Sequence, residues 1–169
     1  MSDGISRLGI VLLPDVASDA RIRRMWSLLE GPELILPNRG RPHITAALVA
    51  EDDRETAGEA LAGIAANMQG MRIAFDSLGL FPGEQPVLFL NPVASGGLLA
   101  LHRRIHDALR LSGTRSLGPN YDPGQWVPHL TLGLVPDAER LGPALAIANR
   151  FRLRFEVTFV ARAAMRLES

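Results

Sequence analysis

The sequence predicts an α/β (α+β) fold with two pseudo-symmetric halves around a central cleft. Both halves read as strand, helix, strand, helix, strand, and each contains one Pro-His-apolar-Thr tetrad, at Pro42–Thr45 and Pro128–Thr131. A repeat of about 80 residues is too long for a solenoid and suits two lobes. We therefore expect mainly antiparallel sheets in a single domain over residues 1–169, with lobe-forming repeats at 5–81 and 86–168.

The first half is predicted to begin with a strand over 5–13, because its short apolar run is closed by Pro14. A helix follows, since Ser18 and Asp19 suit a helix N-terminus and Gly31 is a stop signal. The remaining elements are the first tetrad strand, a helix that begins at Glu51–Asp53 and ends before Gly70, and a strand over Met71–Leu80.

The second half follows the turn-rich segment Pro82–Pro86, which marks the boundary between the repeats. A strand over Val87–Leu90 precedes a helix that Ser95 can cap, and a loop over Gly118–Gly124 leads to the second tetrad strand. A helix within Asp137–Asn149 and a strand over Arg152–Val160 complete this half.

Three segments of the first half match segments of the second in the same order, which indicates an internal duplication. They are Leu12–Ser18 with Leu90–Ser95, Pro42–Thr45 with Pro128–Thr131, and Met71–Asp76 with Phe151–Glu156. A two-fold relation between the halves would bring the two tetrads to opposite walls of one groove.

Composition excludes several classes of function. Of 169 residues, 47% are hydrophobic and 21% are charged, and the formal net charge is zero. Non-specific electrostatic binding of long nucleic acid needs an excess of basic groups, so we do not expect it. No Cys is present, which excludes disulfides, thiolate catalysis and cysteine-based zinc sites. No signal-like N-terminus or membrane-spanning run occurs, so we expect a cytoplasmic protein without membrane association.

The tetrads supply the candidate catalytic residues. Because side chains alternate along a strand, His43 shares a face with Thr45, and His129 shares one with Thr131. Two imidazoles with pKa values near 6.5 can hold opposite protonation states, as general acid–base catalysis requires. Each Thr hydroxyl can donate to an anionic oxygen held between them. Taken singly, each His would read as a core residue and each Thr as a strand former; the shared spacing favours a site.

The duplicated motif resembles that of the two-histidine (2H) phosphoesterase superfamily, and most closely its 2′-5′ RNA ligase / RNA 2′,3′-cyclic phosphodiesterase group. Further similar stretches are Leu88-Phe89-Leu90-x-Pro92, Leu101-His102 and Tyr121-x-Pro123-Gly124-x-Trp126. Gly133 departs from the pattern, since many members place Ala or a basic residue there.

The resemblance implies hydrolysis of 2′,3′-cyclic phosphate ends of RNA or small nucleotides to 2′-phosphates, together with a capacity for 2′-5′ RNA ligation. It implies that this reaction needs no metal. We expect no cofactor and no stable protein partner, and we expect a monomer. By the same analogy, His43 is the general acid and His129 the general base, although the residues themselves leave this assignment open.

Other candidates for substrate binding are less specific. Arg39 and Arg41 can reach a phosphate from the loop before His43, or lie in solvent. Tyr121 and Trp126 can stack on a base, as aromatic residues do for single-stranded RNA, although Trp126 also suits the core.

His102 and His106 have the i, i+4 spacing of a helical metal pair, but no acid completes that pattern, so no metal site is expected. Three alternative functions remain open. One is a non-catalytic module that binds RNA ends or phosphate, and another is a metal-dependent hydrolase that uses the two helical histidines. The third is the same chemistry on ADP-ribose cyclic phosphate or 2′-5′ oligonucleotides.

Overall fold

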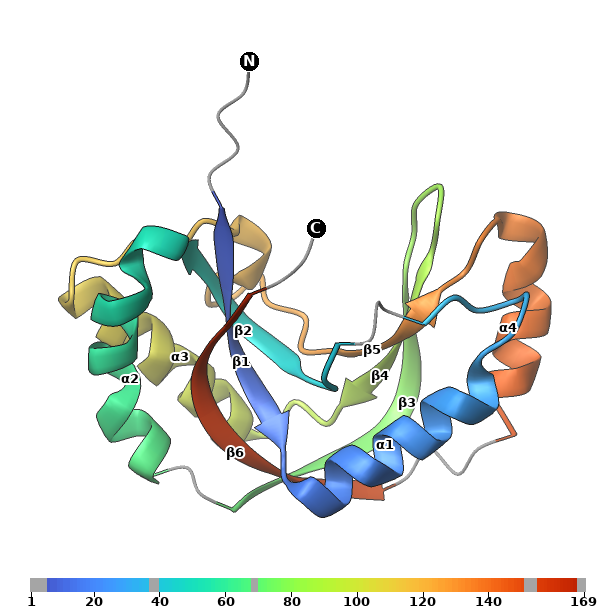
Figure 1. The fold of residues 1–169 in the computed structure, drawn as a ribbon, viewed down its shortest axis with the longest axis horizontal. Coiled ribbons are helices and arrows are strands. Elements are labelled where there is room, and N and C mark those ends of the chain that lie inside the picture. Colours follow the sequence, from blue (N-terminus) through green and yellow to red (C-terminus); the bar gives the residue numbers. More distant parts are fainter. Residues whose placement is uncertain (1–5, 37–39, 68–69, 151–154, 167–169) are drawn as a thin grey trace.

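The computed structural model describes residues 6–36, 40–67, 70–150 and 155–166, and gives the backbone alone for 67 and 160–166. The strands are β1 (Arg7–Pro14), β2 (Ile44–Ala50), β3 (Met71–Phe81), β4 (Val87–Pro92), β5 (Leu130–Leu134) and β6 (Phe155–Arg166). The helices are α1 (Val16–Leu29), α2 (Arg54–Asn67), α3 (Gly96–Leu111) and α4 (Leu141–Ala148), with short 3₁₀ turns η1 (Glu51–Asp53), η2 (Pro119–Tyr121) and η3 (Ala138–Arg140) (Figure 1).

The strands form one antiparallel sheet in the order β2-β1-β6-β3-β4-β5, which confirms the predicted fold class. The two halves share this sheet because their last strands pair with each other, with Phe75 opposite Phe155. Each of these central strands therefore has both of its neighbours in the other half of the chain.

The strand registers have an internal two-fold relation. Exchanging the halves turns β2-β1-β6 into β5-β4-β3, which is the same order read from the other end. Val11 pairs with Thr45, and Phe89 pairs with Thr131, and a register shift immediately precedes Val11 in one pair and Phe89 in the other. We infer that the two tetrads occupy equivalent positions in the fold.

The register corrects one of the sequence matches. Pro14 pairs with Phe159, and Pro92 pairs with Phe75, so Phe75 is equivalent to Phe159 rather than to Phe155. The sequence match of Met71–Asp76 with Phe151–Glu156 is thus displaced by four residues from the structural equivalence. Residues 151–154 lie outside the described residues.

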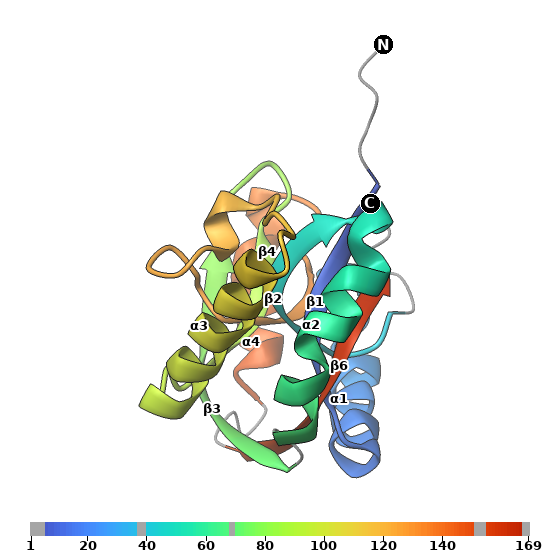
Figure 2. The same ribbon diagram turned by 90° about the vertical axis from the view of Figure 1, so that its left-hand side faces the viewer.

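The helices cover the outer face of the curved sheet in two pairs, each with one helix from either half. Helices α2 and α3 lie over β2, β1 and β6, whereas α1 and α4 lie on the side of β3, β4 and β5 (Figures 1 and 2). Apolar residues from the sheet and all four helices form one buried cluster. None of the helices in the described ranges is both long and apolar enough to cross a membrane.

The N-cap of α3 agrees with the sequence prediction, whereas that of α1 differs from it. Ser95 caps α3 as predicted, and its Oγ accepts a hydrogen bond from the Leu98 N–H. Helix α1 starts earlier than predicted, because Asp15 is the N-cap and accepts from the Ser18 N–H at 2.8 Å. Asp19 then lies in the first turn, where its side chain is free for other contacts.

Candidate functional site

His43 and His129 lie immediately before β2 and β5 and make the same hydrogen bond. The Nδ1–H of His43 donates to the Arg41 carbonyl oxygen at 2.7 Å, and that of His129 donates to the Val127 carbonyl oxygen at 2.8 Å. Because a carbonyl only accepts, Nδ1 bears the proton in both rings. In each neutral ring, Nε2 is therefore the nitrogen left to accept a proton.

Burial affects the protonation of both imidazoles, and His43 affects that of His129 as well. Burial lowers the pKa of His43, against the raising effect of its bond to the Arg41 carbonyl. Burial also lowers the pKa of His129; the bond to Val127 raises it, and the charge of His43 lowers it further. A proton on one ring thus disfavours a proton on the other, which suits a pair that works in opposite protonation states.

The two edge strands that follow these histidines approach each other because the sheet curves (Figure 1). The Trp126 Nε1–H, in the segment before β5, donates to the Thr45 carbonyl oxygen in β2 at 2.9 Å. Thr45 itself is buried, with 4% of its surface exposed, whereas Thr131 reaches a pocket wall. The equivalent threonines thus differ in their access to a ligand.

A pocket of about 650 Å³ opens beside His129. This volume is within the range of small-molecule sites. Its lining contains no carboxylate and no guanidinium; it consists of Phe81, Val87, Asn120, Tyr121, Gln125, Val127, His129, Thr131 and Leu134.

Two phenylalanine rings enclose His129. The ring centroid of Phe81 lies 4.9 Å from that of His129 in an edge-on arrangement, and the centroid of Phe89 lies 5.5 Å away. The Phe89 ring lies over Gly79, where an added Cβ would stand 2.1 Å from it. Sequence reasoning missed this wall; a glycine inside a strand, which often marks a close approach of another group, was the available signal.

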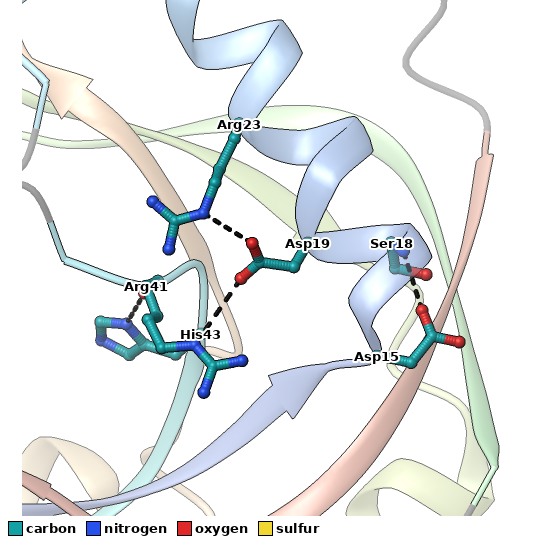
Figure 3. Close-up of polar contacts among 6 residues, drawn as sticks. All are labelled: Asp15, Ser18, Asp19, Arg23, Arg41 and His43. Atoms are coloured by element: carbon teal, nitrogen blue, oxygen red, sulfur yellow. Dashed lines mark hydrogen bonds and ion pairs between the residues drawn. The ribbon is translucent and has the colours of Figure 1, made fainter.

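A cluster of charged residues lies on the His43 side (Figure 3). Asp19 of α1 lies between two arginines: its Oδ2 accepts from Arg23 Nε at 2.6 Å, and its Oδ1 lies 3.8 Å from Arg41 Nε. That Oδ1 is buried without a hydrogen-bond partner. The sequence predicts for Asp19 only a place at a helix N-terminus. Arg39, the other arginine predicted to bind phosphate, lies outside the described residues.

The predicted aromatic residues have different surroundings. Tyr121 lines the pocket, whereas Trp126 stacks on His102 with ring centroids 3.9 Å apart and planes 3° from parallel. The Trp126 indole therefore joins α3 to β2, through this stack and its bond to Thr45.

The helical histidines are bound to backbone carbonyls. Nε2–H of His102 donates to the carbonyl oxygens of Ala46 at 3.0 Å and Tyr121 at 2.8 Å, and Nε2–H of His106 donates to Ala46 at 3.1 Å. Burial, and next the neighbouring His106, lower the pKa of His102 to about 4. Throughout the described ranges, no group of three His, Asp or Glu side chains could hold a metal ion.

The close packing around Gly133 explains why this position departs from the family pattern. A Cβ on Gly133 would lie 2.7 Å from the Ile35 carbonyl oxygen and 2.7 Å from Leu34 Cγ. The Leu34–Ile35 segment bonds to β5 through Leu134 at this point. A basic side chain therefore has no room here.

Comparisons with known proteins agree with this fold. A family model described as the 2′-5′ RNA ligase superfamily matches residues 14–165. The MHV ns2 PDE domain has 18% identity and a TM-score of 0.57, over 94% of this chain and 95% of that one. A phosphoesterase has 18% identity and a TM-score of 0.58, over 97% and 99%. E. coli LigT complexed with 3′-AMP has 20% identity and a TM-score of 0.53, over 79% and 73%. No curated protein matches the chain.

Proposed function

The chain belongs to the 2′-5′ RNA ligase superfamily, and we propose that it is a phosphodiesterase that opens 2′,3′-cyclic phosphate ends of RNA or nucleotides to 2′-phosphates. Membership of this superfamily supports phosphodiesterase- or ligase-type chemistry. The observation that supports our proposal most directly is the pair of histidines with equivalent backbone bonds, of which His43 lowers the pKa of His129. No step of the proposed reaction requires a metal or a cofactor.

The reaction assigns one proton transfer to each ring. Nε2 of His129 takes a proton from water as the water oxygen forms a bond to phosphorus. The bond from phosphorus to the 3′-oxygen breaks, and that oxygen takes a proton from Nε2–H of the His43 imidazolium. The products are a 2′-phosphate and a 3′-hydroxyl, and proton exchange with solvent restores the histidines. Each transfer should contribute about 10²–10⁴-fold to the rate.

The same two rings support 2′-5′ ligation. If the 5′-hydroxyl of a second nucleoside replaces water, its proton goes to His129 and its oxygen bonds to phosphorus. The 3′-oxygen leaves with the proton from His43, so the product is a 2′-5′ phosphodiester. In either reaction, the Thr45 and Thr131 hydroxyls are proposed to donate to the phosphate oxygens that gain charge in the transition state.

The proposed ligands are RNA ends or small cyclic-phosphate nucleotides. The pocket beside His129 is large enough for a nucleoside, and Tyr121 offers it an aromatic wall. The LigT structure contains 3′-AMP, which shows that a protein of this fold can hold a nucleotide. Arg41 and Arg39 are the basic residues proposed to contact phosphate from the loop before His43. We also propose that the protein is a monomer and that it acts in the cytoplasm.

The test is hydrolysis of a nucleoside 2′,3′-cyclic phosphate in the presence of EDTA. Wild type should form the 2′-phosphate, and His43→Ala and His129→Ala should each lower kcat at least about 100-fold, because each removes one proton transfer. His106→Ala is the matched control, since that ring lies on α3 and bonds to a backbone carbonyl. It should retain activity.

Full activity in either tetrad variant would overturn the mechanism. Wild type that binds the cyclic phosphate without turnover, with affinity kept after His→Ala substitution, would favour the binding-module alternative. ADP-ribose cyclic phosphate and 2′-5′ oligonucleotides belong in the same assay, because they test the same chemistry on other substrates.

A further inference from the structure

The internal two-fold relation identifies a position at which the two halves of the site differ. Arg41 and Val127 are equivalent, since each offers its carbonyl to the histidine two residues later. One position has a guanidinium and the other an isopropyl group. The backbone bonds around the two tetrads are thus nearly symmetric, whereas the charge beside them is not.

On the His43 side, two arginines share one carboxylate. Asp19 bonds to Arg23 and lies near Arg41, which leaves this cluster with an excess positive charge. The Arg41 side chain is 47% exposed, and its nearest atom to Asp19 is Nε. The two terminal nitrogens of Arg41 are therefore directed elsewhere, and a planar guanidinium binds phosphate through two parallel N–H groups.

The carboxylate of Asp19 stabilises the position of the Arg41 side chain. Its Oδ1 is buried and has no hydrogen-bond partner, although Arg41 Nε is only 3.8 Å away. A buried carboxylate oxygen without a donor is costly, so a nearby cation is favoured. Asp19 thus acts as a positioning residue for Arg41 (Figure 3).

On the His129 side, the lining of the pocket contains no basic residue other than the histidine itself. Val127, Phe81 and Leu134 give it apolar walls, while Asn120 and Gln125 supply amides. A second phosphate, beyond the one that reacts between the histidines, would lose hydration in this pocket without a compensating charge. An uncharged group, such as a nucleoside with a free 5′-hydroxyl, fits this side better.

We propose that this difference in charge orients the substrate. Arg41, positioned by Asp19, binds the phosphate on the 5′ side of the nucleotide that bears the cyclic phosphate. The pocket beyond His129 receives the uncharged group that attacks, either water or a nucleoside 5′-hydroxyl. This inference rests on the proposed function and narrows its substrate class to RNA or oligonucleotide ends that have such a second phosphate.

The reach of the chain is compatible with this arrangement. Arg41 precedes His43 by two residues, so their Cα atoms lie at most about 7 Å apart. Arg41 and His43 can therefore contact neighbouring parts of one bound nucleotide.

The test compares two substrates that differ by one group. One is adenosine 2′,3′-cyclic phosphate with a free 5′-hydroxyl, and the other has a 5′-phosphate in addition. Wild type should prefer the second by about tenfold or more in kcat/KM, as expected for one charge-assisted contact. Arg41→Gln should bring the ratio close to one, and Asp19→Asn should lower it in the same direction.

The control is Arg104→Gln, which removes an exposed arginine of α3 and should leave the ratio as in wild type. Arg41→Gln keeps the backbone carbonyl that binds His43. If residue 41 had a purely structural role, this variant would change kcat/KM for both substrates by the same factor and leave their ratio unchanged. Added salt should reduce the wild-type preference, because it screens an exposed ion contact.

Two results would overturn the inference while leaving the proposed function intact. One is a wild-type ratio near one, and the other is an unchanged ratio in Arg41→Gln. Hydrolysis of neither substrate by wild type would instead refute the proposed function, and this inference with it.

Discussion

His43 and His129 each bond one ring nitrogen to the backbone two residues earlier, and this has consequences for catalysis. The bond fixes the ring's orientation and keeps the proton on Nδ1, so in the proposed reaction every proton transfer would take place at Nε2. It also stabilises the imidazolium, which partly offsets the effect of burial on each pKa. Each ring can thus alternate between its two forms without rotating.

The pH dependence of kcat/KM tests this pair. Burial lowers both pKa values below 6.5, and the charge of His43 lowers that of His129 further. The base must be neutral and the acid protonated, so activity rises and then falls as pH increases through the two apparent pKa values of the pair. Because both values are lowered, the maximum of kcat/KM on a cyclic phosphodiester should lie below pH 6.5. A plateau that extends through pH 7 to 9 would contradict the assignment of a histidine as the acid.

At the scale of elements, the segment between α3 and β5 matters most, because it brings Tyr121 and His129 to the pocket. It contains only the short turn η2, and its position depends on contacts with other elements. The Leu117 N–H donates to the Leu48 carbonyl oxygen, and His102 of α3 donates to Tyr121 while its ring stacks on Trp126. Helix α3 thus holds one wall of the pocket.

Replacing His102 should loosen this wall. His102→Leu removes the bonds to Ala46 and Tyr121 from a residue that is 3% exposed, so at pH 7 we expect a loss of about 1–3 kcal/mol of unfolding free energy. The folded-state pKa of about 4 lies below the unfolded value of 6.5. The unfolded chain therefore binds more protons between these values, and the contribution of His102 to stability falls as pH decreases from 6.5 to 4.

Denaturant unfolding of both proteins at pH 7 and pH 4.5 measures this effect. The difference between wild type and His102→Leu should be smaller at the lower pH. If wild type and His102→Leu differed in unfolding free energy by the same amount at both pH values, the lowered pKa of His102 would not affect stability.

Elements were predictable from sequence where the signal was local. Short apolar runs closed by Pro14 or Pro92 indicated strands, and Ser95 indicated a helix cap. The N-cap of α1 was ambiguous because Asp15, Ser18 and Asp19 all suit a helix start. Strand partners were not predictable, since alternation shows which face a side chain occupies but not which strand lies beside it.

At the scale of the whole molecule, the same limit applies to the site. The paired histidines were recognisable because a polar pattern occurs twice in the sequence. Asp19 and the Phe81–Phe89 wall were not, because their roles depend on contacts with Arg41 and His129 that only the folded chain creates. Those contacts arise at the places where the two repeats differ, so the duplication predicts the shared chemistry and cannot predict the asymmetry.

The arrangement of the sheet predicts that neither repeat folds alone. Within the described ranges, β3 pairs only with β6 and β4, and β6 pairs only with β1 and β3, so the partners of each strand lie in the other half of the chain. A chain divided between Gly83 and Glu84, in the exposed β3–β4 turn, should give two fragments that show no cooperative thermal unfolding separately. An equimolar mixture should regain the circular dichroism spectrum of the intact protein, because the central pairing of β3 with β6 forms between the fragments.

The intact chain, as control, should unfold in one transition, since a continuous sheet joins both halves. Cooperative unfolding of residues 1–83 alone would mean that the first repeat is an independent lobe, and that the central pairing is not required for its stability.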